Sequence, residues 1–219
     1  MDPRANAEDE KRLAAQRAAE LVASGMAVGL GTGSTVGHLL PALAERELDI
    51  RCVATSPRTA DAARELGLLV EPSDSLDRLD IAIDGADQVA PDGWLVKGGG
   101  GAHAREKIVA AAAERFIVIV DSSKPVGKIT PPIPLELSAF GLASTLRELG
   151  AARLREGPAS PDGGVLADYL GEIGDPQRLA SRLADLPGVI EHGLFPPSLV
   201  SEVLIGRGHE VIRVAPISP

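Results

Sequence analysis

Groups that form cross-links, metal clusters or aromatic stacks are scarce in this sequence of 219 residues. Cys52 is the only cysteine, which excludes a disulfide within the chain and a metal site built from several cysteines. The four histidines include no pair three or four residues apart, the spacing that places two metal ligands on one helix face. Aromatic residues make up only 2% of the chain, so the core must be aliphatic and an aromatic platform for single-stranded nucleic acid is excluded.

Positive charge and long apolar runs are also scarce. Lys and Arg number 22 against 31 Asp and Glu, so the formal net charge is −9, and the chain lacks the positive field that binding to nucleic acid or anionic membranes needs. No apolar run approaches the roughly 20 residues that span a membrane, and the charged segment 1–12 lacks the apolar core of a signal peptide. We therefore expect a cytoplasmic protein without a nucleic-acid or membrane partner, in which a local site binds any phosphorylated ligand.

Short apolar strands alternate with helical patterns over the first 120 residues. Helices are expected at 8–24, 35–47, 57–66 and 102–114, and strands at 26–30, 50–55, 68–70, 79–84, 94–96 and 116–120. Pro41 lies inside the second helix and predicts a kink or an early end there. The alternation predicts an α/β fold, with a Rossmann-like open parallel sheet and helices on both of its faces.

A smaller C-terminal unit is expected after the prolines at 131, 132 and 134. Its elements fit a β-α-β-β-α-β order, with helical patterns at 139–149 and 175–186 and strand patterns at 152–156, 164–169, 189–192, 201–205 and 210–214. This order is typical of a ferredoxin-like α+β unit. We predict a larger α/β domain over about residues 1–130, which could also include residues 205–219, and a smaller α+β domain over residues 131–204.

The first segment that could carry chemistry is Gly-Leu-Gly-Thr-Gly-Ser-Thr, at residues 29–35. Glycines let the backbone approach a phosphate, and amides and hydroxyls at a helix N-terminus point donors at it. The segment is not a dinucleotide-binding pattern, because Ser34 replaces the third glycine, and it is not a Walker A loop, because the required lysine is missing. It indicates an anion site for a small molecule, and a tight turn with a Ser or Thr cap is the alternative.

Two acidic residues lie at the end of the next apolar strand, in Ile-Asp-Gly-Ala-Asp at residues 83–87. Open α/β sheets bind ligands just beyond the carboxyl ends of their strands, so Asp84 and Asp87 are placed for acid–base chemistry or for binding sugar hydroxyls. A plain turn is the alternative, because Asp and Gly are common turn residues. The two carboxylates could also bind a metal, but no further ligand cluster supports that interpretation.

Four successive glycines at 98–101 follow Lys97, and a helix that contains Glu106 follows them. Such a run has a large entropic cost unless the backbone must bend sharply or contact a ligand. Glu106 shares its helix face with alanine and valine, and a carboxylate on an apolar face is expected to have a raised pKa, as a general base near neutral pH requires. The alternative for Glu106 is an ion pair with Lys107 or another cation, and His103 is interpreted as an incidental helix position.

A fourth segment, Asp-Ser-Ser-Lys at residues 121–124, follows the strong strand at 116–120. Like Asp84, Asp121 is expected at the end of a strand. Lys124 could supply the positive charge that a phosphate site needs in an acidic protein. A solvated lysine is the alternative interpretation.

In this order and spacing, GLGTGST, IDGAD, KGGGGAxxREK and DSSK together resemble ribose-5-phosphate isomerase of the A type, which uses no cofactor. The resemblance runs from about residue 25 to residue 206, and the glycine-rich KGGGG…REK segment is its most specific part. The family usually has glutamate where this chain has Gln88, and an aliphatic pair where this chain has His-Ala at 103–104. The acids, the lysine and the helical glutamate are all retained, so activity is expected to persist.

The resemblance implies reversible conversion of D-ribose 5-phosphate to D-ribulose 5-phosphate through an enediolate, in the non-oxidative pentose phosphate pathway. It implies that Glu106 is the base that moves a proton between C2 and C1. It implies that Asp84 is the acid for ring opening and for proton movement between O1 and O2. Asp87 and Lys97 would hold hydroxyls and stabilise the enediolate.

The resemblance also implies the remaining substrate contacts and the assembly. The substrate, chiefly its phosphate end, would be held by Thr32, Gly33, Ser34, Thr35 and Lys124. Further substrate contacts would come from Gly85, Ala86, Gly98, Gly99 and Gly100. No metal or nucleotide cofactor is implied, the partner is a small sugar phosphate, and a homodimer or homotetramer is expected.

Two other functions are compatible with the same superfamily architecture. A sugar-phosphate sensor domain of a transcription regulator would keep the anion loop but would normally be joined to a DNA-binding segment, for which residues 1–25 are too short. A coenzyme A transferase would need a glutamate that attacks a thioester, and an assay of thioester exchange would distinguish it.

Overall fold

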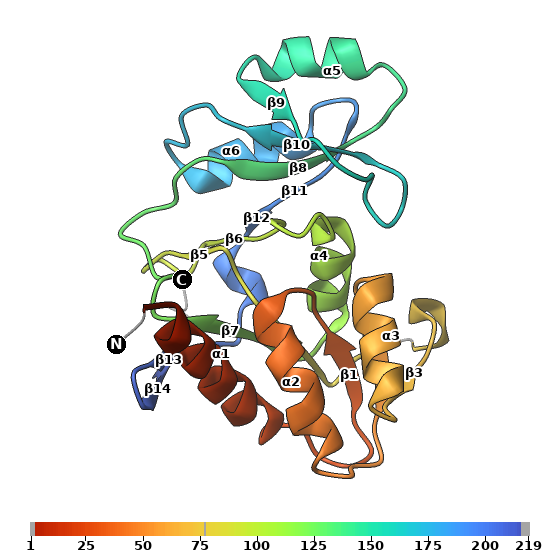
Figure 1. Ribbon diagram of the computed structural model, residues 1–219. Coiled ribbons are helices and arrows are strands. Elements are labelled where there is room, and N and C mark those ends of the chain that lie inside the picture. The colour runs from red at the N-terminus through yellow and green to blue at the C-terminus, as the bar shows by residue number, and fades with distance from the viewer. Residues whose placement is uncertain (1–2, 77, 216–219) are drawn as a thin grey trace. The chain divides into compact units, whose positions relative to one another are not determined.

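The computed structural model describes residues 3–76 and 78–215, which form two units (Figure 1). The first unit contains the chain up to residue 86, residues 105–124 and the chain from residue 198 onward; the second contains residues 87–104 and 125–197. The sequence predicts boundaries near residues 130 and 204 and keeps residues 87–104 with the larger domain, whereas the structure packs that segment into the second unit. The division into folding domains stays a prediction.

Within the described residues, the first unit is built on a seven-stranded sheet in the order β14-β13-β7-β4-β1-β2-β3. Neighbouring strands are parallel except in the β13–β14 hairpin. The strands are β1 (Ala27–Leu30), β2 (Arg51–Ala54), β3 (Leu69–Val70), β4 (Ile81–Asp84), β7 (Phe116–Asp121), β13 (Glu202–Arg207) and β14 (Glu210–Val214). The predicted open α/β sheet is confirmed, and the hairpin makes it mixed instead of purely parallel.

Helices cover both faces of this sheet, as the sequence predicts. They are α1 (Pro3–Ala19), α2 (Ser34–Ala44), α3 (Pro57–Glu65) and most of α4 (His103–Ala112), with a 3-10 turn η1 (Ser73–Ser75) after β3. Side chains alternate along β1, so Val28 and Leu30 enter the core beneath α1 and α2, which lie side by side (Figure 1). Gly29 faces the opposite way: a Cβ on it would lie 2.5 Å from Val109 Cγ1, so the missing side chain lets α4 pack closely on that face.

The helix α2 continues past Pro41 to Ala44, and the N–H of Glu45 donates to the carbonyl of Pro41. Proline removes the hydrogen bond that its own N–H would give to the carbonyl four residues earlier. The helix tolerates this loss one turn before its end and stops three residues before the predicted end at residue 47.

The second unit contains a four-stranded antiparallel sheet in the order β11-β8-β10-β9. Its elements are β8 (Ile133–Leu137), α5 (Leu142–Leu149), β9 (Ala152–Leu154), β10 (Val165–Tyr169), α6 (Pro176–Ala184) and β11 (Val189–His192). This is the predicted β-α-β-β-α-β unit, and its first strand lies in the proline-rich stretch where the sequence predicts none. A small sheet β12-β6-β5 contains β5 (Gln88–Val89), β6 (Leu95–Val96) and β12 (Leu194–Phe195), and the 3-10 turn η2 (Pro197–Leu199) follows β12.

The four-stranded sheet has one apolar and one more polar face. Odd-numbered residues of β8 and β10 point into an apolar core with α5 and α6. The even-numbered residues Pro134, Glu136, Leu166 and Asp168 lie on the opposite face. A Cβ on Gly101 would lie 2.5 Å from Leu166 Cδ1, so the glycine run of residues 98–101 packs directly against this second face.

Candidate active site

Three loops of the first unit leave the carboxyl ends of adjacent parallel strands. The strands β1, β4 and β7 are neighbours, with Leu30 paired to Ile83 and Asp84 paired to Val118. Parallel strands end at the same edge of a sheet, so the loops that begin at residues 31, 85 and 122 lie along one edge. The sequence predicts this position for three of its four chemical segments.

Asp84 is the last residue of β4 and is only 3% exposed. Its Oδ1 accepts hydrogen bonds from the backbone N–H groups of Thr32 (3.0 Å) and Gly85 (2.7 Å). Gly31 lies against the same carboxylate, because a Cβ on Gly31 would lie 1.9 Å from Asp84 Cγ. The glycine loop and the carboxylate are therefore built together, and the carboxylate fills the space that Gly31 leaves.

The glycine loop leads into the N-terminus of α2. Gly33 is the N-cap residue, with a φ of 122° that favours glycine, and among the described residues no side chain caps this helix end. The first N–H groups of a helix lack partners within it, so those of Ser34 and Thr35 are suited to bind an anion. Thr32 Oγ1 lies 2.8 Å from Thr55 Oγ1, which ties the loop to the residue after β2. These features fit the predicted anion site better than the capped turn.

Glu106 lies in the first turn of α4 and is 4% exposed. Ala102, Val109 and Ala110 are buried on the same helix face, as the spacing in the sequence predicts. Glu106 therefore lies on a buried, apolar helix face. Its action as a base stays a prediction.

Lys124 closes a tight turn after β7. The carboxylate of Asp121 is buried and accepts a hydrogen bond from the N–H of Ser123 at 2.9 Å, and the N–H of Lys124 donates to the carbonyl of Asp121 at 3.2 Å. The Lys124 residue is half-buried at the same sheet edge as Asp84. This position permits the predicted phosphate contact.

The turn before Lys124 is anchored by Glu10 of α1, which the sequence analysis does not single out. Its carboxylate accepts hydrogen bonds from the N–H groups of Ser122 (3.0 Å) and Gly208 (2.8 Å). Burial acts to raise the pKa of Glu10, but these hydrogen bonds outweigh burial, so the pKa lies below its usual value. Glu10 therefore ties α1 to the Lys124 turn and to the β13–β14 hairpin as an ionised group.

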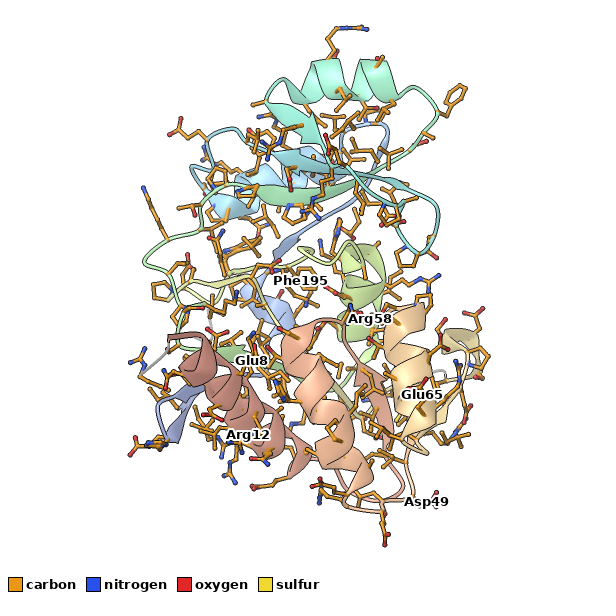
Figure 2. All side chains as sticks on the ribbon, in the orientation of Figure 1. Glu8, Arg12, Asp49, Arg58, Glu65 and Phe195 are labelled. Carbon is orange, nitrogen blue, oxygen red and sulfur yellow. The ribbon has the colours of Figure 1, made fainter. Side chains whose placement is uncertain are left out.

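The second unit holds the other predicted residues, Asp87, Lys97 and Gly98–Gly100. Asp87 is exposed, and its Oδ2 accepts a hydrogen bond from the N–H of Gly99 at 2.8 Å. Lys97 is 3% exposed, and its Nζ lies 5.4 Å from the centroid of the ring of Phe195, which Figure 2 labels. An ammonium is attracted to the face of an aromatic ring, so a buried positive charge is tolerated there. The second unit thus supplies a cation, a carboxylate and a series of glycine amides.

Two positions of the glycine run require glycine. Gly98 has a φ of 109° and Gly101 a φ of 76°, and a Cβ on Gly98 would lie 2.7 Å from His103 Nδ1. His103 is fully buried, and its Nε2 lies 3.4 Å from the carbonyl oxygen of Glu191. His103 therefore packs beneath the run, which its interpretation as an incidental helix position does not anticipate.

Gln88 occupies the position where the family that the sequence resembles usually has glutamate. Its Nε2 donates to the carbonyl of Thr130 at 2.8 Å, and its Oε1 accepts from the N–H (2.9 Å) and the hydroxyl (3.3 Å) of Thr130. An amide can donate and accept at once, whereas an ionised carboxylate only accepts. The glutamine at residue 88 therefore joins β5 to the loop before β8.

No sequence pattern points to Arg155, the first residue after β9, or to Asp168 of β10. Arg155 contacts the carbonyl of Gly98, a residue 57 positions away in the chain. Arg155 lies in no motif, and no local pattern relates it to the glycine run. The contact becomes visible only when the antiparallel sheet is assembled.

Among residues 3–76 and 78–215, no group of three or more His, Cys, Asp or Glu side chains could hold a metal ion. No described helix is long and apolar enough to cross a membrane. Burial raises the pKa of the Cys52 thiol to about 12, so this thiol is unsuited to act as a nucleophile.

The chain matches the family model of ribose 5-phosphate isomerase A (phosphoriboisomerase A) over residues 51–210. A ribose-5-phosphate isomerase A from Caulobacter sp. (strain K31) is 43% identical over 228 residues, covering 96% of this chain and 100% of that relative. The relative of the same name from Rhodopseudomonas palustris (strain BisB5) is 47% identical over 221 residues, covering 91% of this chain and 94% of that relative.

Solved structures show the same fold over almost the whole chain. Ribose 5 phosphate isomerase A from Neisseria gonorrhoeae has a TM-score of 0.92 and 31% identity, covering 96% of this chain and 98% of that one. A D-ribose-5-phosphate isomerase in complex with phospho-erythronic acid has a TM-score of 0.91 and 33% identity, covering 96% and 99%. These similarities agree with the resemblance of the motifs and give no support to the sensor or the coenzyme A transferase.

Proposed function

Because this chain belongs to the ribose-5-phosphate isomerase A family, we propose a role in the reaction for each of its site residues. The protein is an isomerase that interconverts D-ribose 5-phosphate and D-ribulose 5-phosphate in the pentose phosphate pathway. The reaction moves a proton between C2 and C1, so it needs a base, an acid and groups that stabilise the enediolate oxygens. The observation that carries the proposal is the buried Asp84 carboxylate, held by N–H groups of its own turn and of the glycine loop.

In the proposed mechanism, Glu106 removes the proton from C2 and returns it to C1. Burial of Glu106 on the apolar face of α4 supports this role, because it limits the access of water to the transferred proton. Asp84 acts on the oxygen atoms of the substrate: it assists ring opening and moves a proton between O1 and O2. The two N–H donors on Oδ1 fix the orientation of the Asp84 carboxylate before the substrate arrives.

Asp87 and Lys97 are proposed to hold the sugar hydroxyls and to stabilise the enediolate, with the amides of Gly98–Gly100 lining the site. Lys97 supplies a positive charge in a site of low water content, where electrostatic stabilisation is strongest.

The phosphate is proposed to bind at residues 32–35 and Lys124, with Gly85 and Ala86 contacting the rest of the substrate. The N-terminus of α2 offers backbone N–H groups, Ser34 and Thr35 offer hydroxyls, and Lys124 offers a charge at the same sheet edge. The relative solved with phospho-erythronic acid supports binding of a phosphorylated sugar compound at this fold.

These roles need neither a metal ion nor a nucleotide, because side chains and amides supply each proton and each charge.

We also propose a homodimer or homotetramer in the cytoplasm. Sedimentation of the purified protein would measure the assembly directly, and a monomer at enzyme-assay concentrations would contradict it.

The experiment that tests the mechanism is Glu106→Gln, assayed by ketose formation from ribose 5-phosphate. Glutamine keeps the shape and hydrogen bonds of the side chain but cannot accept the proton, so kcat should fall by about 10²–10⁴-fold while KM changes little. Glu65→Gln is the matched control: Glu65 is exposed at the end of α3 (Figure 2), and its variant should keep wild-type kinetics.

Deuterated water provides a second readout of the same step. The wild-type enzyme should introduce solvent deuterium into the product to the extent that the proton on Glu106 exchanges before it is returned. Glu106→Gln should introduce it at a similarly reduced rate. Near-wild-type turnover by Glu106→Gln would assign the base to Asp84 or Asp87 instead.

A further inference from the structure

We propose that Arg155, held in place by Asp168, is a positioning residue that fixes the peptide group between Gly98 and Gly99 and, through it, the carboxylate of Asp87. The proposal rests on the function proposed above for the glycine run and for Asp87. It adds to that function a chain of contacts that lies entirely within the second unit.

The first contact joins Arg155 to the glycine run. Its Nη1 donates to the carbonyl oxygen of Gly98 at 2.7 Å and lies 3.5 Å from the carbonyl oxygen of Gly99. The Arg155 side chain is 19% exposed, so water competes little for its donors. A charged donor gives a stronger hydrogen bond than a neutral one, which suits a contact that must restrain a flexible segment.

The second contact fixes the guanidinium itself. Arg155 Nε and Nη2 both donate to Asp168 Oδ1, at 3.0 and 2.7 Å, and the Asp168 side chain is 12% exposed. Asp168 lies on β10 directly opposite Pro134 of β8, on the sheet face that the glycine run covers. Two donors on one carboxylate set the plane of the guanidinium, so its remaining nitrogen is aimed at Gly98.

The third contact lies at the other end of the same peptide group. The carbonyl that accepts from Arg155 belongs to Gly98, and the N–H of that peptide belongs to Gly99, which donates to Asp87 Oδ2 at 2.8 Å. Asp168, Arg155, the peptide and Asp87 thus form an alternating series of acceptors and donors. Hydrogen bonds in series polarise one another, so the arginine also makes the Gly99 N–H a better donor to Asp87.

This arrangement restrains a segment of backbone that its glycines make flexible. Glycine rotates easily, and Gly98 already has a φ of 109°, so the Gly98–Gly99 peptide, whose carbonyl also accepts from the N–H of Gly101 at 3.0 Å, could turn over at modest cost unless side chains restrain it further. Asp87 is exposed and would lose the N–H that orients it if the peptide turned. Arg155 is therefore placed to keep both the amide and the carboxylate in one orientation.

The test compares Arg155→Ala with Arg147→Ala in the full-length enzyme. Arg147 is exposed on α5 of the same unit and serves as the control, with wild-type kinetics expected. Arg155→Ala should lower kcat by about 10–100-fold, as expected when a reacting group shifts by about 1 Å, while KM changes less than about threefold because the proposed phosphate ligands belong to the first unit. Arg155→Lys keeps the charge but has one nitrogen where Arg155 uses three to contact Asp168 and Gly98, so it should recover only part of the loss.

A spectroscopic readout separates positioning from general damage. The chain has 24 glycines, so ¹⁵N-glycine labelling gives a spectrum in which the Gly99 amide can be assigned. Arg155→Ala should move the Gly99 signal and speed its hydrogen exchange, whereas Arg147→Ala should leave both unchanged. If Arg155→Ala does not fold, Asp168→Asn provides the same comparison, because it retains the shape of the side chain and removes only the charge that holds the arginine.

Two outcomes would overturn the proposal: a wild-type kcat in Arg155→Ala, or a lowered kcat with an unmoved Gly99 signal. Its failure is distinguishable from failure of the proposed function. If Arg155→Ala keeps its kcat while Glu106→Gln loses activity, only the positioning by Arg155 is wrong. If Glu106→Gln also keeps its activity, the assignment of the proton transfer itself is wrong.

Discussion

Gly31→Ala should disable the enzyme by displacing Asp84, although it adds only one methyl group. That methyl would lie 1.9 Å from Asp84 Cγ and 2.0 Å from Asp84 Oδ1. Non-bonded carbon atoms rest at about 3.5–4.0 Å, so relief of the overlap needs a movement of about 1.5–2 Å by the carboxylate or by the loop. Either movement breaks the hydrogen bonds that Asp84 Oδ1 accepts from Thr32 and Gly85.

The size of the effect follows from this displacement. A misplacement of about 1 Å at a reacting group costs on the order of 10²-fold in rate, so Gly31→Ala should lower kcat by about 10²–10³-fold. Overpacking a buried site costs about 1–3 kcal/mol of unfolding free energy, which for a chain of this length lowers Tm by about 2–12 °C. The protein should therefore remain folded at 25 °C and be nearly inactive.

Gly37→Ala is the matched control for the same chemical change. Gly37 lies in α2, is exposed, and has no atom within 4 Å of a Cβ built on it. Alanine is the better helix former by up to about 1 kcal/mol, so Gly37→Ala should raise Tm slightly and leave kcat unchanged. The assay follows ketose formation from ribose 5-phosphate alongside thermal unfolding by circular dichroism. A folded Gly31→Ala enzyme with wild-type kcat would refute the reasoning, because the position of the Asp84 carboxylate would then be irrelevant to turnover.

Two further predictions follow from shifted pKa values. Burial raises the pKa of the Cys52 thiol to about 12, so the thiolate fraction at pH 8 is on the order of 10⁻⁴. A disulfide reagent should therefore label Cys52 only after denaturation. Rapid labelling of the native enzyme would contradict the structure. The pKa of Glu10 is lowered below its ordinary 4.5 in the folded state, so its stabilising effect should be complete above that value and be lost as the pH falls through the folded pKa. Denaturant unfolding should therefore show wild type more stable than Glu10→Gln at pH 7, with the difference shrinking below about pH 4.5, and a difference independent of pH would argue against the ionised anchor.

The architecture of the first unit could be predicted because its signals are local. Apolar strands such as Phe116–Asp121 are buried throughout, and each is followed directly by the segment that carries its chemistry. Once alternating strands and helices indicate a parallel sheet, the carboxyl ends of the strands must share an edge. The glycine loop, Asp84 and Lys124 could thus be assigned to one sheet edge from sequence order alone.

The first strand of the second unit could not be predicted, because proline argues against an interior strand. Pro134 lies within β8, which has β11 on one side and β10 on the other. The strand accommodates it because Pro134 still accepts a hydrogen bond through its carbonyl, from the N–H of Gly193 at 2.7 Å. Strands of two residues such as β5 and β12 are too short to show an alternating pattern.

The glycine run shows most clearly why a sequence motif is easier to recognise than the residues that hold it in place. Four glycines allow the backbone to take the conformations that Gly98 and Gly101 require, but the same freedom leaves their peptide groups weakly oriented, with a hydrogen bond from the Gly101 N–H to the Gly98 carbonyl within the run. Further restraint comes from side chains outside the run, and no spacing rule ties them to it: His103 lies two residues after Gly101, Asp87 precedes the run by eleven residues, and Arg155 lies 57 residues beyond Gly98. A sequence can thus reveal where a flexible glycine-rich loop lies, whereas the residues that restrain this loop are set by the fold of the sheet beneath it.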